Sequence, residues 1–338
     1  MKPQPSLMTR MAGPDFRLGR RQALAATGAL ALSPWSLAQR SYPDHAVKLV
    51  VPNAPGSSVD TIGRVVGIEM ARLLGQPMVI DNRAGAAGAI GVEAVRNAPA
   101  DGYTVLVGSS SAMSVAPLLQ KAVSYNALRD FELISLMALL PNVLVCNPLL
   151  PVQSVAQLVA YAKAKGNASN MASAGVGSVS HLAGMALQSA AGFKSLHVPY
   201  KGGAQGVASV VSGETDWVLT PAPAAMSLVG AGRLRLLGHS MSPASRPLGS
   251  TPSLGTSLPG FEFASWIGLL APKGTPAPVI ELLGKTMATA LQRAEVQKAF
   301  EANGAVAEAS SPEAFRAYLA RDIEINRRAV ATAGLQPE

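Results

Sequence analysis

Short runs of β-branched residues alternate with helical segments along most of this chain, and this alternation limits its fold more than any other feature. Residues 47–51 (VKLVV) have strand character, residues 60–74 place apolar side chains along one side of a helix, and residues 78–80 (MVI) form the next strand. Residues 103–107 (YTVLV) add a third strand. Strands that alternate with helices form parallel sheets covered on both faces. We therefore expect an α/β fold.

A second series of strands and helices follows an apolar segment at 139–151. Three prolines interrupt this segment, which excludes a membrane helix, and we interpret it as a crossover strand between two domains. Without its leader the chain has about 300 residues, enough for two domains with cores of their own. We place the first domain at 44–142 together with 256–338, and the second at 143–255.

Helix-capping signals mark two of the later helices. Ser154 and Gln157 have capping-box spacing at the start of a helix that follows the crossover, and Ser310 and Glu313 have it before the last helix. Further strands are expected at 170–172, 197–198, 217–219, 234–237 and 266–270. Further helices are expected at 180–191, 204–212, 277–293 and 313–333.

The first 38 residues have the order of a removable export leader. Basic residues precede an apolar run at 23–32, and small residues follow, with cleavage expected after Ala38. The run is shorter than the roughly 18 to 20 residues of a membrane span. Arg20 and Arg21 favour the twin-arginine route, with the general secretory route as the alternative because Ala23 replaces a bulkier residue. Both routes predict a periplasmic protein that is soluble after cleavage.

The mature chain is only mildly basic. The sequence has 28 Lys and Arg against 20 Asp and Glu, and five of the former and one of the latter lie in the leader, which leaves a net charge of about +4. Since there is no dense basic stripe or aromatic platform, nucleic acid is not an expected partner. The single cysteine, Cys146, ends an apolar run and can form no internal disulfide, so we expect its side chain to be buried.

Three loops ahead of predicted helices consist mainly of small, hydroxyl-bearing and glycine residues. They lie at 55–58 (PGSS), 108–111 (GSSS) and 173–180 (SAGVGSVS). Small side chains let backbone N–H groups approach a ligand, and helix N-termini carry partial positive charge, so the loops suit a carboxylate. Helix capping would explain one such loop. Three at corresponding points of two domains predict a shared anion site beyond the strand ends.

The sequence gives less support for catalysis than for an anion-binding site. The sequence has no Gly-x-Ser-x-Gly elbow, no His-Glu-x-x-His pair and no paired metal-ligand spacing, and the glycines at 85–91 have the wrong spacing for a dinucleotide-binding turn. We expect no enzyme, no metal and no cofactor. His181, at a candidate loop, is interpreted as helix structure or a ligand contact rather than a general base. A serine hydrolase using Ser109–Ser111 with a lysine is a minor alternative, because no lysine lies near that loop in the sequence.

Eight short motifs together resemble one protein family. They are VPNAPGSSVD at 51–60, LGQP at 74–77, DNRAG at 81–85, DGYT at 101–104, PNVL at 141–144, SHLAG at 180–184, VPYKG at 198–202 and LPGFE at 258–262. Each motif is weak alone, but eight in order, over essentially all of the mature chain, are specific. They resemble the Bug, or TctC-like, solute-binding receptors of tripartite tricarboxylate transporters.

The resemblance implies a type II periplasmic-binding-protein fold, with two doubly wound α/β domains joined by crossover strands and an organic acid in the cleft between them. It implies a non-catalytic receptor that delivers its ligand to membrane transporter subunits. An orphan receptor that presents its ligand to a sensor protein is an alternative. We expect a monomer, because a receptor that opens and closes needs no partner subunit.

Site residues carried over from the resemblance come from both domains. The first would supply Ser57, Ser58, Ser109, Ser110 and Ser111, and the second Ser178, Ser180, His181, Tyr200 and Thr220, with Lys201 either a contact or a solvent-facing side chain. Thr220 stands where relatives often have an Asp, so an anchor for an ammonium group is missing. We therefore expect a mono- or dicarboxylate with a neutral or aromatic distal part. Candidate apolar walls, with core packing as the alternative for the tryptophans, are Met113, Trp217 and Trp266.

Overall fold

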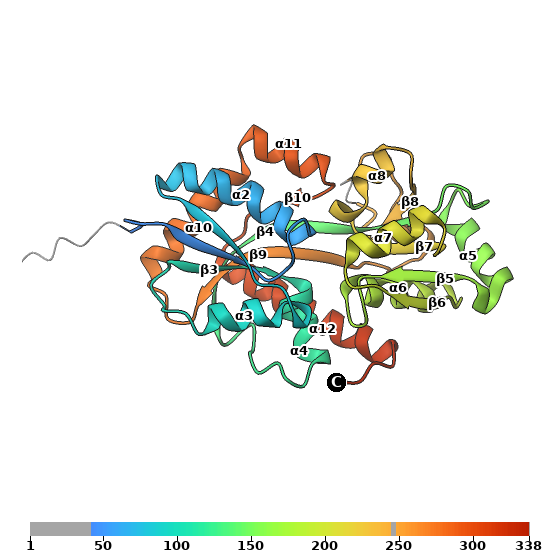
Figure 1. The fold of residues 1–338 in the computed structure, drawn as a ribbon, viewed down its shortest axis with the longest axis horizontal. Coiled ribbons are helices and arrows are strands. Elements are labelled where there is room, and N and C mark those ends of the chain that lie inside the picture. Colours follow the sequence, from blue (N-terminus) through green and yellow to red (C-terminus); the bar gives the residue numbers. More distant parts are fainter. Residues whose placement is uncertain (1–41, 245–247, 338) are drawn as a thin grey trace, which may run out of the picture. The chain divides into compact units, whose positions relative to one another are not determined.

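The strands of this chain join into one mixed sheet that helices cover (Figure 1). The structure, a computed structural model, describes residues 42–244 and 248–337, so the predicted leader, with Arg20 and Arg21, lies outside the described residues. The strands are β1 (Val47–Val51), β2 (Met78–Asn82), β3 (Thr104–Ser109), β4 (Phe131–Cys146), β5 (Asn170–Ser173), β6 (Leu196–Pro199), β7 (Trp217–Pro221), β8 (Arg235–His239), β9 (Ala264–Pro272) and β10 (Val306–Ala307).

The helices fall into a long and a short group. The long ones are α2 (Ser58–Leu74), α3 (Ala89–Arg96), α5 (Val155–Lys165), α6 (Val179–Ala191), α7 (Gly203–Ser212), α10 (Ala277–Leu291), α11 (Ala294–Ala302) and α12 (Pro312–Thr332). The short ones are η2 (Ala86–Gly88), the π-helical turn η3 (Ser111–Val115), α4 (Ala116–Leu119), η4 (Gly166–Ala168), η5 (Ala222–Ala224), α8 (Met226–Gly230) and α9 (Leu254–Ser257).

The strand order is β2-β1-β3-β9-β4-β7-β5-β6, with β8 and β10 paired to β4. As predicted, β1 is parallel to β2 and β3, and β5 is parallel to β6 and β7. The expected crossover strands are an exception to the predicted parallel pairing, because β4 and β9 run antiparallel to their neighbours. Hydrophobic periodicity predicts a strand but not its direction.

Strand β4 belongs to two parts of the sheet. It pairs with β9 as far as Pro141 and with β7 from Asn142 onward. We call β1, β2, β3, β9, β10 and the start of β4 the first half of the sheet, and the end of β4 with β5 to β8 the second half. Pro141 is tolerated because the strand changes partners there, where a missing N–H costs least. The change lies beside the predicted boundary at residue 142, but the two sets of domain bounds stay a prediction.

Asn142, Ser240 and Phe263 tie together the segments that connect the two halves. Asn142 is fully buried, and its Nδ2 donates to the Phe263 carbonyl at 2.5 Å while its backbone N–H donates to Ser240 Oγ at 3.0 Å. Ser240 Oγ donates to the same Phe263 carbonyl at 2.5 Å. Because buried polar groups must find partners, these bonds fix β4 against the ends of β8 and β9. We call this group the crossover cluster.

Each half of the sheet has an apolar core on both faces. In the first half, α2 and α10 pack on one face, against residues such as Leu49, and α3 and α12 pack on the other, around Trp266. In the second half, α5 and α6 pack around Trp217, and α7 packs on the opposite face around Val143. These cores hold the strand ends, and the loops that follow them, in fixed positions.

Three differences between the predicted and the observed helices have a local cause. Helix α2 begins at Ser58 rather than at residue 60, because Ser57 is its N-cap. The N-cap of α12 is Ser311, whereas Ser310 Oγ accepts from the Leu136 N–H instead. Helix α11 was not predicted, because only Gln292 and the extended residue Arg293, neither of them Gly or Pro, separate it from α10. None of the described helices is long and apolar enough to cross a membrane.

Removing the Asn142 side chain should destabilise the protein. In Asn142→Ala the Phe263 carbonyl loses a buried donor, and we expect the free energy of unfolding, measured by urea titration, to fall by about 2 kcal/mol. Asn97 is exposed at the end of α3, and Asn97→Ala should change the free energy by less than about 0.5 kcal/mol. Equal effects of the two substitutions would contradict the role of the crossover cluster.

Candidate functional site

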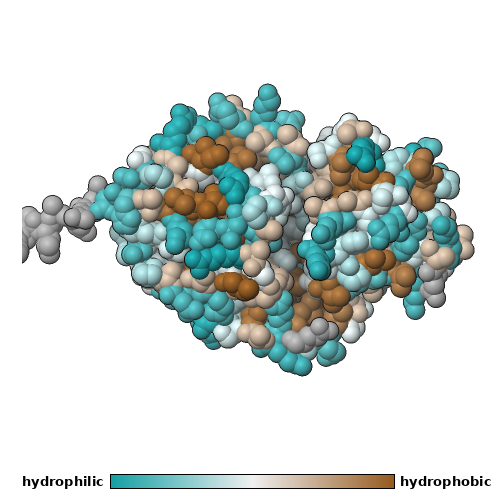
Figure 2. Space-filling model, in the orientation of Figure 1, coloured by the Kyte–Doolittle hydropathy of each residue, from teal (hydrophilic) through white to brown (hydrophobic). Residues whose placement is uncertain are grey.

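A cavity of about 520 Å³ lies at the carboxyl ends of the strands, lined by loops from both halves of the sheet. Its walls include the loop after β1, the end of β3, and the segments that follow β5, β6 and β7. Figure 2 shows a hollow with pale walls, of intermediate hydropathy, in the middle of this face. The volume is within the roughly 300–1,000 Å³ of small-molecule sites, so this cavity is the candidate site.

Asp60 shapes the first wall, the loop at 53–58. Its buried carboxylate accepts from the Gly56 N–H at 2.8 Å and from Arg64 Nε at 2.9 Å, while Asn82 Nδ2 donates to its other oxygen at 2.8 Å. Burial alone would raise the pKa of Asp60, but the hydrogen bonds from Arg64 and Asn82 outweigh it and lower the pKa. Asn82 also donates to the Asn53 carbonyl at 3.0 Å. Asp60 stands in the first quoted motif, but no local pattern indicated this positioning role.

The second wall is the serine-rich turn where β3 ends and η3 begins. Ser110 Oγ accepts from the Trp266 backbone N–H at 2.9 Å, which joins the turn to β9. Asp322 of α12 adds a second link, since its Oδ2 accepts from Trp266 Nε1 at 2.7 Å and from Ser114 Oγ at 2.5 Å. Burial raises the pKa of Asp322 to about 6. In contrast, Ser109 Oγ is buried without a hydrogen-bond partner.

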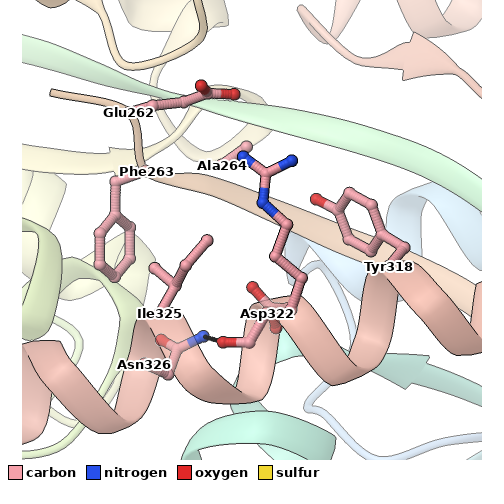
Figure 3. A pocket seen from close by; sticks show the side chains of 8 residues that line it. Glu262, Phe263, Ala264, Tyr318, Asp322, Ile325 and Asn326 are labelled. Atoms are coloured by element: carbon pink, nitrogen blue, oxygen red, sulfur yellow. Dashed lines mark hydrogen bonds between the residues drawn. The ribbon is translucent and has the colours of Figure 1, made fainter. Parts of the chain in front are cut away.

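Asp322 also lines a smaller pocket of about 80 Å³ (Figure 3). Tyr318 and Ile325 project from α12 toward the segment at 262–264, whereas Asn326 lies along the helix and its Nδ2 donates to the Asp322 carbonyl at 2.8 Å. This volume is far below the range of small-molecule sites. The larger cavity is therefore the better candidate for a ligand.

In the second half, Ser178 and Ser180 hold the loop that leads into α6. Ser178 is the N-cap of the helix, with its Oγ accepting from the His181 N–H at 3.2 Å, and Ser180 Oγ accepts from the Ala174 N–H at 2.9 Å. Behind them the His181 ring stacks on His197, with centroids 3.8 Å apart. His181 Nδ1 accepts from the Gly177 N–H at 3.1 Å, so the neutral ring carries its proton on Nε2.

The predicted site residues fall into three groups. Four line the cavity with hydroxyls that make no hydrogen bond within the described chain, and we call them the free hydroxyls: Ser58, Ser109, Ser111 and Thr220. Four line it with hydroxyls already bonded to the protein: Ser57, Ser110, Ser178 and Ser180. Two do not line it, because His181 supports the loop at 173–180 from behind and Tyr200 packs on the core of the second half.

Lys201 is the one charged side chain among the described residues that line the cavity. Trp266 is among the lining residues, but its side chain, like those of Met113 and Trp217, is fully buried in a core. Core packing, the alternative for the tryptophans, therefore describes both of them. Cys146 is buried as predicted, and burial raises the pKa of its thiol to about 11. The described residues contain no group of three His, Cys, Asp or Glu side chains that could hold a metal ion.

The stacked histidines should make stability depend on pH. Burial, and then the neighbouring His197, lowers the pKa of His181 from 6.5 to about 4, so the unfolded chain binds this proton at higher pH than the folded one. The contribution of neutral His181 to the free energy of unfolding is therefore fully present above about pH 7 and is lost as the pH falls toward 4. We expect His181 alone to account for about 1 kcal/mol between roughly pH 7.5 and 5.5.

Urea unfolding at the two pH values measures this contribution. The His181→Phe variant should lose less stability than the parent protein when the pH is lowered. His45, exposed near the start of the described residues, provides the matched control, and His45→Phe should retain the parent's pH dependence. If His181→Phe also retains the parent's pH dependence, His181 is not its source.

Known proteins share this fold. The family model described as "Tripartite tricarboxylate transporter family receptor" (TctC) matches residues 62–333. Protein BugT of Bordetella pertussis is 34% identical over 286 residues, which cover 84% of this chain and 88% of BugT. R. palustris Rpa4515, solved with adipate, is 31% identical with a TM-score of 0.82, and the match covers 88% of this chain and 100% of that one.

A second solved structure, MatC (Rpa3494) from Rhodopseudomonas palustris with bound malate, is 27% identical with a TM-score of 0.76. The match covers 86% of this chain and 100% of MatC. The similarity to these structures confirms the type II periplasmic-binding-protein fold expected from the sequence. Because the family model matches most of the chain, and BugT is similar over nearly its whole length, this chain belongs to the TctC, or Bug, family of tripartite tricarboxylate transporter receptors.

Proposed function

We propose that this protein captures a small organic acid in the cavity and delivers it to a membrane transporter of the tripartite tricarboxylate type. The observation that carries the proposal is the group of free hydroxyls, above all Ser109 Oγ, which is buried without a partner. A buried hydroxyl that lacks a hydrogen bond costs about 1–3 kcal/mol. An accepting ligand group recovers that free energy.

A carboxylate matches the donors of the first half of the sheet. Ser58, Ser109 and Ser111 offer O–H donors from two neighbouring loops, and the first turn of α2 adds backbone N–H groups that no carbonyl within the helix can accept. The positive end of the α2 dipole also favours an anion. Rpa4515 and MatC, solved with adipate and malate, are relatives that hold carboxylates, which supports the same ligand class here.

A receptor explains the cavity better than an enzyme does. The described lining residues include no Asp, Glu or His, so the free serines have no carboxylate or imidazole base beside them. Lys201 lines the same cavity as Ser109–Ser111, although it is distant from them in the sequence. The fold therefore supplies the lysine that the serine-hydrolase alternative requires. The family and its solved members are solute-binding receptors, which favours binding without turnover.

Carboxylate binding can be measured by thermal shift and isothermal titration. A ligand at 100 times its dissociation constant should stabilise the protein by about 2.7 kcal/mol. Ser109→Ala and Ser111→Ala should each weaken binding of the best acid by about tenfold, because each removes a donor to a charged group. Ser189 is exposed on α6 and makes no side-chain hydrogen bond within the described chain, so Ser189→Ala should bind like the parent protein.

Turnover distinguishes the receptor from the hydrolase. The proposal requires that the bound acid, or an ester of it, is recovered unchanged after long incubation with the protein. If the protein converts the ligand, and Ser109→Ala, Ser110→Ala or Ser111→Ala abolishes that conversion, the protein is an enzyme and the cavity is its active site.

We also propose that the protein works in the periplasm as a soluble monomer after its leader is removed. The order of basic, apolar and small residues in the first 38 positions supports export, and the family's role in uptake agrees with it. Replacing Arg20 and Arg21 with Lys should leave folded precursor in the cytoplasm, measured by cell fractionation. Normal export of that variant would assign the leader to the general secretory route.

A further inference from the structure

The main cavity has a second buried polar atom that lacks a hydrogen-bond partner in the described chain, in addition to Ser109 Oγ. It is Oδ1 of Asn53, a residue that follows β1 and lines the cavity. An amide oxygen can only accept hydrogen bonds, whereas a serine hydroxyl can also donate one. The cavity therefore contains an unsatisfied acceptor as well as an unsatisfied donor.

The two atoms come from the ends of neighbouring strands. Strand β1 runs parallel to β3, with Val50 opposite Leu106. Three residues further along each strand direction stand Asn53 and Ser109. Neighbouring strands lie about 4.8 Å apart, so one small ligand can contact both side chains.

Asn82 fixes the backbone that carries the Asn53 amide. Asn82 Nδ2 donates one hydrogen to the Asn53 carbonyl at 3.0 Å and the other to Asp60 Oδ1 at 2.8 Å. Its own Oδ1 accepts from Arg64 Nη2 at 2.8 Å, so the orientation of the Asn82 amide is set. Asn82 therefore has no hydrogen left for Asn53 Oδ1. A group that the ligand brings can satisfy this oxygen.

An ionised carboxylate satisfies only one member of this pair. Its oxygens are acceptors, so they match the Ser109 hydroxyl and are repelled by Asn53 Oδ1, which requires an O–H or N–H group. A ligand ammonium group is disfavoured, because the described lining residues include no Asp or Glu and their one charged side chain is that of Lys201. A neutral hydroxyl meets both conditions.

We propose that Asn53 is a specificity-determining residue, which selects organic acids that carry a hydroxyl on the carbon next to the carboxylate. This inference rests on the proposed function, in which Ser109 and the neighbouring serines bind the carboxylate. The hydroxyl of such a 2-hydroxy acid donates to Asn53 Oδ1. An acid without the hydroxyl leaves Asn53 Oδ1 unsatisfied, and a 2-oxo acid places a second acceptor against it.

Titration calorimetry with matched sets of acids tests this role. The sets are lactate, pyruvate and propionate; mandelate, phenylglyoxylate and phenylacetate; and 2-hydroxyglutarate, 2-oxoglutarate and glutarate. Each set keeps one carbon skeleton and places a hydroxyl, an oxo group or only hydrogen next to a carboxylate. In the set that binds best, the hydroxy acid should bind about tenfold tighter than the unsubstituted acid, and tighter still relative to the oxo acid. This comparison uses the parent protein and needs no variant.

A variant then assigns the preference to one side chain. Asn53→Leu replaces the amide by an apolar side chain of similar size, and it should weaken hydroxy-acid binding by about tenfold while unsubstituted-acid binding stays within about twofold. Asn97 is exposed at the end of α3 and does not line the cavity, so Asn97→Leu should retain the parent's preference.

The outcomes separate this inference from the proposed function. Equal affinity for the hydroxy and unsubstituted acids in the parent protein overturns the role of Asn53 but leaves the receptor proposal standing. A preference that survives in Asn53→Leu, or an equal loss of affinity for all acids of a set, has the same consequence. Failure of every carboxylate to bind overturns both.

Discussion

The crossover cluster is the constraint on which the rest of the site depends. Asn142, Ser240 and Phe263 hydrogen-bond one another in a fully buried place where the chain passes between the two halves of the sheet. The register of β4 follows from it: Val143 lies opposite Thr220, and Leu140 lies opposite Ser265. Residues from both halves thereby meet at the floor of one cavity. An apolar contact there could slide, whereas a satisfied polar group fixes one arrangement.

Polar side chains near the cavity divide according to whether the protein itself satisfies them. Ser110, Ser178 and Ser180 each complete a loop or a helix N-terminus, and Asp60 and Asp322 hold those loops from inside the fold. The side chains of the free hydroxyls and of Lys201 make no hydrogen bond or ion pair within the described chain. Because native proteins leave few buried polar groups unpaired, the buried and unpaired Ser109 Oγ in the cavity marks where a ligand group belongs.

Much of this arrangement can be predicted from the sequence, and the failures have physical causes. The strand at 47–51 and the serine caps follow from local patterns, since periodicity and capping act over a few residues. The antiparallel direction of β9 depends on how a distant segment returns, which no local pattern encodes. Likewise, Ser109 and Ser110 are adjacent and chemically identical. Only the approach of the Trp266 N–H, from 156 residues away, separates the bonded hydroxyl from the free one.

The most direct test of this account is a crystal structure of the protein grown with the carboxylic acid that it binds best. One carboxylate should lie within hydrogen-bonding distance of Ser109 Oγ and Ser111 Oγ, at the N-terminus of α2. A ligand bound elsewhere, or bound in this cavity with the free hydroxyls still unpaired, would contradict the claim that unsatisfied groups of the fold define the site.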